Sequence, residues 1–136
     1  MDTADIRQRF ASAPVARLAT VREDGAPHVV PVCFALDGNS IVSAVDGKPK
    51  RTQRLRRLDN VRAHPEVSFL VDRYDDDWTR LWWVRVDGIA TVLEGGVAHV
   101  HAIDLLAAKY AQYRQLRPTG PVLVITALRW QGWSAS

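Results

Sequence analysis

Two Asp-Gly turns near the N-terminus constrain the fold of this chain more than any other feature. Asp24-Gly25 stands between two β-prone runs, 15–21 and 27–36, and Asp37-Gly38 stands between the second run and a third, 41–45. An Asp-Gly pair between such runs favours the tight turn of a β-hairpin. Strands joined by tight turns run antiparallel, so the first three strands are predicted to form an antiparallel sheet.

Three further strands and three helical segments complete the predicted fold. The strands fall at 67–72, 81–93 and 122–130, and the helices at 3–13, from about Lys50 onwards, and at 97–116. Strands and helices do not alternate regularly, which disfavours a doubly wound parallel sheet. We therefore predict a mainly-β single domain over residues 1–136: a small six-stranded antiparallel β-barrel with helices plugging its ends.

Three local patterns refine this prediction. Pro31 lies in the middle of the second strand, where a residue without an amide proton indicates an edge, a bulge or a ligand. Gly88 lies inside the fifth strand and indicates a bulge or a sharp bend. In the last helix one buried stripe is predicted from helical spacing, made of Ile103, Leu106, Tyr110 and Tyr113.

Composition excludes several classes of protein. Hydrophobic residues make up 47% of the 136 residues and charged residues 24%, which is typical of a soluble globular protein. No apolar run approaches the ~20 residues that span a bilayer, and the acidic start of the chain is unlike a signal peptide. The single cysteine, Cys33, excludes an internal disulfide and a multi-cysteine metal site. We expect a cytoplasmic protein with no membrane association and no metal.

The segment between the third and fourth strands is strongly basic. Seven of the 18 Lys and Arg residues lie between Lys48 and Arg62, whereas the only acids nearby are Asp46 and Asp59. A turn rich in amide donors, followed by a helix start and a dense cationic face, is suited to binding an anion. Leu55, Leu58 and Val61 are predicted to dock the other face of this helix on the barrel.

Three explanations of the basic segment remain. An exposed basic helix needs no ligand, but a solvated helix usually interleaves charges of both signs. Nucleic acid would need exposed aromatic residues among the basic ones, and no standard nucleic-acid-binding motif is present, so this partner is disfavoured. An anionic partner is therefore favoured, and a phosphorylated cofactor, which offers one or a few phosphates, is the remaining candidate.

Other kinds of catalytic chemistry have no support in the sequence. The histidines at 28, 64, 99 and 101 lack metal-ligand spacing, and His28 is assigned a structural or solvent-facing role. Cys33, in an apolar strand, is predicted to be a buried small hydrophobe. Neither a nucleophile elbow nor a phosphate-binding glycine loop occurs. The catalytic residues therefore stay unassigned.

The tryptophans indicate an interface. Five are present, and the adjacent Trp82 and Trp83 must face opposite sides of their strand. One of the pair can fill the barrel, and the other must lie under a helix, against a ligand or at a subunit interface. Five tryptophans exceed what so small a core easily hides, so we predict a homodimer.

The order and spacing of many short motifs resemble the pyridoxamine 5′-phosphate oxidase-like split β-barrel flavoproteins. More narrowly, the chain is similar to the coenzyme F420-dependent enzymes of actinobacteria. The first resemblance is carried by Ala19-Thr20-Val21, Asp24 to Val32, Asp46-Gly47-Lys48-Pro49-Lys50, Arg54-Leu55, Asn60-Val61, His64 to Val67 and Gly88-Ile89-Ala90. The narrower one is carried by Tyr74 to Trp78, Arg80 to Arg85, Lys109-Tyr110, Gln112-Tyr113, Arg129-Trp130 and Gly132-Trp133.

This resemblance implies a six-stranded split barrel that dimerises, with two cofactors in grooves between the subunits. Carried over by position, the phosphate contacts would be Lys48, Lys50, Arg51 and Thr52, with Arg54 and Arg57 as further candidates. The ring system would lie near Val30, Pro31, Val32 and Ser43. Trp78 and Arg80 would reach the site from the other subunit.

The basic segment also bears on which cofactor is bound. FMN carries one phosphomonoester, whereas F420 carries a phosphodiester and an oligoglutamate tail, so its negative charge extends further. A cationic surface from Lys48 to Arg57 is longer than one phosphate requires. We therefore predict an F420H2-dependent oxidoreductase that transfers a hydride between the deazaflavin and an unidentified small organic substrate. An FMN-dependent oxidase or reductase and a non-catalytic F420 carrier are the alternatives.

Overall fold

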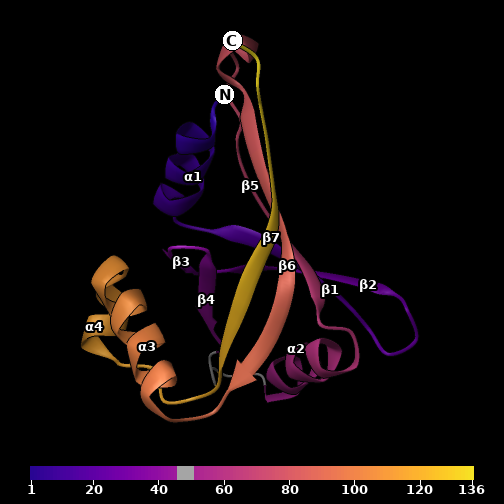
Figure 1. Cartoon of the computed structure of the whole chain (residues 1–136), viewed down its shortest axis with the longest axis vertical. Coiled ribbons are helices and arrows are strands. Elements are labelled where there is room, and N and C mark those ends of the chain that lie inside the picture. Colours follow the sequence, from indigo (N-terminus) through magenta and orange to yellow (C-terminus); the bar gives the residue numbers. More distant parts are fainter. Residues whose placement is uncertain (46–50) are drawn as a thin grey trace.

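The computed structural model describes residues 1–45 and 51–136, with side chains for all of these except residues 51–55. Figure 1 shows a long, twisted antiparallel sheet with helices against it. In chain order the elements are α1 (Thr3–Ser12), β1 (Ala16–Val21), β2 (Pro27–Val32), β3 (Ala35–Asp37), β4 (Ser40–Ala44), α2 (Arg51–Ala63), β5 (Glu66–Arg73), the 3-10 helix η1 (Trp78–Arg80), β6 (Trp82–Leu93), α3 (Val97–Lys109), α4 (Ala111–Gln115) and β7 (Val122–Ser134).

The strands form one antiparallel sheet in the order β2-β1-β5-β6-β7-β4-β3. The strands at its two edges, β2 and β3, are consecutive in the chain, so the sheet must curl for Cys33 and Phe34 to join them. The mainly-β antiparallel fold predicted from the sequence is confirmed. The described residues contain seven strands rather than six, because the predicted strand 27–36 divides into β2, which pairs with β1, and β3, which pairs with β4.

The division of strand 27–36 is stabilised by hydrogen bonds to its unpaired backbone. The Ser43 hydroxyl donates to the carbonyl of Cys33 at 2.7 Å. The amide of Phe34 donates to the Tyr110 hydroxyl at 3.1 Å, and the carbonyl of Phe34 accepts from the Lys109 ammonium at 2.9 Å. Buried backbone groups that leave a sheet need such partners.

The bend predicted at Gly88 is present. The β6–β7 register shifts between Asp87 and Gly88, so that Asp87 pairs with Arg129 but Gly88 pairs with Ala127. A Cβ atom on Gly88 would lie 2.4 Å from the carbonyl oxygen of Thr126. Only glycine therefore permits β7 to approach this closely.

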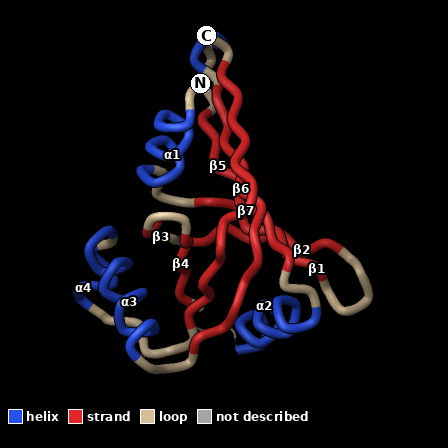
Figure 2. Tube along the Cα trace, in the orientation of Figure 1, coloured by secondary structure: helices blue, strands red, loops and turns tan. Residues whose placement is uncertain are grey.

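The core lies between the curled sheet and the helices. Phe10 of α1 is fully buried and packs against Phe34, with ring centroids 4.7 Å apart, and edge-on against Trp130 at 5.4 Å. Leu58 and Val61 dock α2 on the same core, as predicted, whereas the side chain of Leu55, the third predicted docking residue, lies outside those described. A second cluster joins α3 to β3, β4 and β7 through Ala102, Ile103 and Leu106. Figure 2 shows α1, α3 and α4 on one side of the sheet and α2 beneath the β1–β2 hairpin.

The predicted helix 97–116 is two helices. Tyr110 interrupts it with an extended backbone, at φ −118° and ψ 121°. Its hydroxyl reaches the backbone of Pro14 and Phe34, and Tyr110 and Tyr113 are half-buried against the second cluster. A tertiary contact therefore overrides the helical periodicity at this residue.

Candidate functional site

The outer face of the sheet carries an apolar groove. Along each strand the side chains alternate between the core and this outer face. The outward-facing residues are neighbours across the sheet: Arg17 pairs with Leu70, Leu70 with Arg85, and Trp83 with Trp133. Together with neighbouring residues they enclose about 660 Å³. Its lining includes Arg17, Ala19, Val29, Leu70, Tyr74, Trp83, Arg85 and Trp133. A broad apolar surface of this kind marks an interface or a ligand site.

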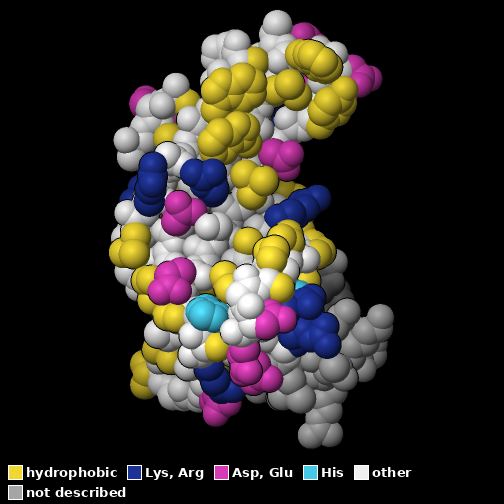
Figure 3. Space-filling model, turned by 90° about the vertical axis from the view of Figure 1, so that its right-hand side faces the viewer, with side chains coloured by type: hydrophobic (Ala, Val, Ile, Leu, Met, Phe, Trp, Pro, Cys, Tyr) yellow, Lys and Arg dark blue, Asp and Glu magenta, His cyan; other side chains and the backbone are white. Residues whose placement is uncertain are grey.

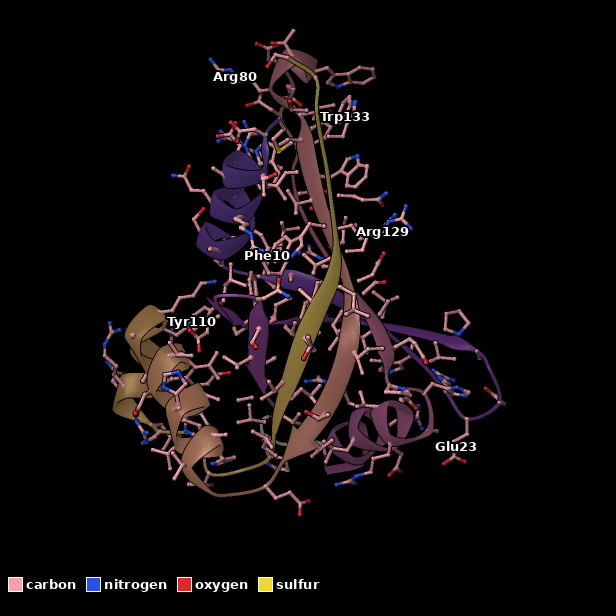
Figure 4. The ribbon with its side chains drawn as sticks, in the orientation of Figure 1. Phe10, Glu23, Arg80, Tyr110, Arg129 and Trp133 are labelled. Atoms are coloured by element: carbon pink, nitrogen blue, oxygen red, sulfur yellow. The ribbon has the colours of Figure 1, made fainter. Side chains whose placement is uncertain are left out.

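The figures show how the groove lies in the molecule. In Figure 3 hydrophobic side chains gather at the upper end of the molecule, above a hollow in its outline. In Figure 4 Trp133 and Arg129 project from β7 to the same side, whereas Phe10 of α1 lies between that helix and the sheet. Trp82 and Trp83 face opposite sides, as the sequence predicts: Trp82 packs against the core and beneath the Arg9 guanidinium of α1, whereas Trp83 lies beside Arg85. Both residues contribute to the lining of the groove.

Charged and polar side chains lie beside the groove. The Arg85 guanidinium donates to the side-chain oxygen of Gln131 on β7 and lies 3.6 Å from the carboxylate of Asp87. The Ser68 hydroxyl donates to the same carboxylate at 2.6 Å. These contacts hold Arg85 beside the groove and pair its charge with Asp87.

Trp78 and Arg80 lie at a tip of the molecule. The tip is formed by η1, which Asp77 caps by accepting from the amide and hydroxyl of Thr79. Both hydrogen bonds lower the pKa of the Asp77 carboxyl, and the bond from the Thr79 hydroxyl has the larger effect. Trp78 is 67% exposed, and Figure 4 places Arg80 at the opposite end of the molecule from the β1–β2 hairpin. Within one chain the two residues therefore do not meet β2.

The residues expected near a ring system lie on β2 and β4, and the three on β2 divide between its two faces. Pro31 is exposed on the outer face, opposite Arg17 of β1. Val30 packs against the core, and Val32 and Ser43 are buried. A planar ring beside these four residues would therefore contact the side chain of Pro31 but chiefly the backbone of the other three.

Much of the predicted phosphate site falls in the part of the chain that the structure does not describe. Lys48 and Lys50 lie outside the described residues, as do the side chains of Arg51, Thr52 and Arg54, although α2 starts at Arg51 as the sequence suggests. Arg57 is half-buried. It lies within electrostatic range of His28, whose pKa is lowered by burial first and then by the charges of Arg22, Arg56 and Arg57.

A second polar cluster, which the sequence did not predict, surrounds Lys109. The Lys109 ammonium donates to the carbonyls of Ala13 at 2.8 Å and Phe34 at 2.9 Å, and it lies 3.8 Å from the centroid of the Phe34 ring. Burial lowers the pKa of Lys109 to about 8, and the neighbouring Cys33 opposes this shift. Burial likewise raises the pKa of Tyr110 to about 12. In the sequence these residues stood out only as the Lys109-Tyr110 pair that contributes to the family resemblance, and that resemblance assigned no role to either residue.

The remaining histidines and Cys33 have local contacts. His99 is buried and bonds to the carbonyl of Gly120 at 2.9 Å, and His101 bonds to the carboxylate of Asp37 at 3.0 Å. Cys33 is only partly buried, beside Lys109 and Tyr110, rather than the buried hydrophobe expected. Among the described residues no three His, Cys, Asp or Glu side chains are placed to hold a metal ion, and no helix there is long and apolar enough to cross a membrane.

The fold is a split β-barrel like that of pyridoxamine 5′-phosphate oxidase. The model of the pyridoxamine 5′-phosphate oxidase family matches residues 2–134, so the chain belongs to this family. A comparison with curated proteins found no match.

Solved structures share the fold at low sequence identity. A conserved hypothetical protein from Mycobacterium tuberculosis is 24% identical over 99% of this chain and 86% of its own, with a TM-score of 0.80. A FAD-binding protein from Mesorhizobium loti is 22% identical over 97% and 94%, with a TM-score of 0.73. The haem storage protein HutZ from Vibrio cholerae is 14% identical over 97% and 93%, also with a TM-score of 0.73.

Proposed function

We propose that this protein is a homodimeric, cytoplasmic F420H2-dependent oxidoreductase. It would transfer a hydride between the deazaflavin and a small organic substrate. The observation that carries the proposal is the cationic run from Lys48 to Arg62, placed directly after β4 of a split barrel whose family match spans residues 2–134. A flavin-type cofactor fits the family, and the length of the cationic run favours F420 over FMN.

The donor set of this segment suits an extended anion. Lys48, Lys50, Arg51 and Thr52 would hold the phosphodiester, and Arg54 and Arg57 would lie along the adjoining carboxylate tail. The residues of α2 that the structure describes continue the cationic composition with Arg56, Arg57 and Arg62. When bound, the cofactor supplies the hydride chemistry, and the protein contributes binding, orientation and exclusion of water.

The ring system would lie against β2 and β4. Pro31 offers a rigid, exposed surface without an amide proton, and the backbone of Val30, Val32 and Ser43 would form the adjacent wall. The partner subunit's Trp78 and the partner subunit's Arg80 would complete this site, because within one chain η1, which contains both residues, lies at the opposite end of the molecule from the β1–β2 hairpin.

A second copy of the chain would cover the outer groove. A stable interface buries roughly 800 Å² on each partner, about a tenth of the 7971 Å² surface of this chain. Leu70, Trp83 and Trp133 supply an apolar centre, and Arg17 and Arg85 supply charged groups around it. In a two-fold dimer such a face meets itself.

The proposal is tested by titrating the purified protein with F420, F420H2 and FMN side by side and following fluorescence quenching. We expect saturable binding of F420 and F420H2, weaker binding of FMN, and oxidation of F420H2 in the presence of some quinone, enone or tetrapyrrole. Absence of saturable F420 binding would refute the proposal. A yellow protein with bound FMN would support the FMN alternative, and tight F420 binding without turnover across the substrate panel would support the carrier.

A further inference from the structure

Lysine is rare in this chain, and a single lysine lies among the described residues. Of the 18 basic side chains 15 are arginine, and the lysines other than Lys109 are Lys48 and Lys50, which fall outside the described part. An arginine keeps its charge in any protein environment, whereas a lysine that is moved into apolar surroundings releases its proton readily. The chain thus uses arginine for most of its positive charges and places a lysine at the half-buried end of α3.

The ammonium of Lys109 has dipoles and aromatic rings around it but no carboxylate paired with it. It donates to the carbonyls of Ala13 and Phe34, and it lies 3.8 Å from the centroid of the Phe34 ring and 5.3 Å from that of the Tyr110 ring. The ion pairs found among the described residues do not include Lys109. Burial without an ionic partner favours the uncharged amine.

The uncharged amine keeps its place between the two carbonyls. Loss of one proton leaves two N–H groups, which are enough for the carbonyls of Ala13 and Phe34, and the lone pair takes the position of the lost proton. Two hydrogen bonds fix the orientation of the nitrogen, whereas the amine of an exposed lysine rotates freely. Deprotonation of Lys109 therefore produces a positioned nucleophile.

The surroundings of this nitrogen reach the surface of the molecule. The partly exposed residues here are Ala13, Cys33, Lys109 and Tyr110, and Pro14, which accepts from the Tyr110 hydroxyl at 2.9 Å, is exposed. Figure 4 shows Tyr110 at the end of α3 that lies nearest α1. A small molecule that approaches from this side meets aromatic rings and uncharged backbone.

We infer that Lys109 is an imine-forming site for an uncharged aldehyde or ketone. The amine nitrogen bonds to the carbonyl carbon, both amine protons leave with the carbonyl oxygen as water, and a C=N bond replaces the C=O bond without oxidation or reduction. An uncharged compound is favoured because the groups that contact Lys109 are uncharged and Lys109 gives up its own charge on becoming nucleophilic. The inference does not depend on the identity of the cofactor.

The inference is tested by incubating the full chain with benzaldehyde at pH 8, trapping imines with borohydride and locating the benzylated amines by peptide mass spectrometry. The three lysines and the N-terminal amine are resolved separately, and thiol adducts of aldehydes are not fixed by borohydride. An ordinary lysine, with a pKa of about 10.4, is almost wholly protonated at this pH, so we expect at least about tenfold more product at Lys109 than at Lys48 or Lys50. Concentrated urea should abolish this preference.

Arg114→Lys supplies a matched amine within the same fold. Arg114 is exposed and donates to the carbonyls of Ala107 and Ala108 at 2.8 and 3.1 Å, so the substitution places an amine beside two backbone acceptors but in water. Position 114 should carry at most about a tenth of the product found at Lys109, because an exposed amine stays protonated. With 4-carboxybenzaldehyde, which adds one negative charge to the reagent, the preference for Lys109 over position 114 should be smaller.

Equal product at Lys109 and position 114 would overturn the inference, and so would a preference for Lys109 that persists in urea. If Arg114→Lys fails to fold, the comparison with Lys48 and Lys50 in the native chain decides. A preference unchanged with 4-carboxybenzaldehyde would overturn the assignment to uncharged compounds. F420 titration of the same preparation separates this result from the proposed function: F420 binding without product at Lys109 refutes only the imine site, and the reverse refutes only the proposed cofactor.

Discussion

At the scale of single residues, Lys109 has the most testable environment. Its ammonium connects α3 to the α1–β1 connection and to the β2–β3 link by donating to Ala13 and Phe34. Replacement by Met leaves the carbonyl of Ala13 without this donor, so Lys109→Met should lower the free energy of unfolding by about 1–3 kcal/mol. Arg114→Ala is the control, because Arg114 also donates to two carbonyls but is exposed. Denaturant unfolding measures both, and a smaller loss in Lys109→Met than in Arg114→Ala would contradict the prediction.

The lowered pKa of Lys109 should also affect how the free energy of unfolding depends on pH. Its pKa is about 8 in the folded protein against 10.5 when exposed, so the unfolded chain binds more protons between these values. Stability should therefore rise from pH 8 to 10 in the native protein relative to Lys109→Met. Above pH 10 the raised pKa of Tyr110, about 12, reverses the trend, because the folded protein then holds the extra proton. Chemical denaturation at pH 8, 9 and 10 checks the sign.

Individual residues differ in how far the sequence determines them. The bend at Gly88 and the helix start at Asp2, whose carboxylate accepts the amide of Asp5 at 2.8 Å, follow from local pattern. The Lys109 cluster does not, because its partners lie 75 and 96 residues away in the chain. Likewise the influence of Arg56 and Arg57 on the pKa of His28 did not follow from local pattern, because the two arginines lie on α2 and act on His28 only in the folded chain.

At the scale of elements, the predicted cofactor contacts belong to α2 and to the residues just before it in the sequence. Lys50→Ala combined with Arg51→Ala should weaken F420 binding about a hundredfold, since each charge-assisted contact contributes about 1.5 kcal/mol. The melting temperature should change little, because the core contacts of α2 are made by Leu58 and Val61. The matched control is Arg62→Ala with Arg117→Ala, which removes two exposed, paired cations. A large fall in melting temperature with unchanged affinity would make this segment structural.

Element boundaries were predictable where local chemistry sets them and not where tertiary contacts do. The Asp-Gly turns gave the first hairpin, and the periodicity of α2 gave its docking face. The breaks in 27–36 and 97–116 were missed. Both are held by the same contact, in which Tyr110 of the α3–α4 junction bonds to Phe34 of the β2–β3 link. No local pattern reveals a contact between segments 76 residues apart.

At the scale of the whole molecule, the sequence indicated an antiparallel barrel but not the strand order. The first hairpin follows from its turn, whereas the pairing of β1 with β5 and of β4 with β7 depends on how the sheet closes. The number of tryptophans predicted an interface, which stays a prediction, and the register shows where two of them lie: Trp83 and Trp133 pair on the outer face, away from Phe10 and the core. The alternation of side chains along each strand thus distinguished buried residues from outward-facing ones. Only the fold showed that the outward-facing residues of different strands form one continuous surface.

The proposed dimer gives a prediction at this scale. Leu70 lies on β5 between Arg17 of β1 and Arg85 of β6, in the floor of the outer groove. Leu70→Arg places a third cation there, which is tolerated in a monomer exposed to water but repelled when two such faces meet. Sedimentation equilibrium should show the native protein as a dimer and Leu70→Arg with a dissociation constant raised at least about a hundredfold.

The control for this experiment is Leu116→Arg, which makes the same substitution at a leucine that is 64% exposed at the end of α4. It should leave the dimer intact. Because cofactor sites between subunits require both chains, Leu70→Arg should also weaken F420 binding, whereas Leu116→Arg should not. A monomeric native protein would refute the dimer directly. A dimer equally stable in both variants would place the interface on another face and would leave the outer groove open to a ligand instead.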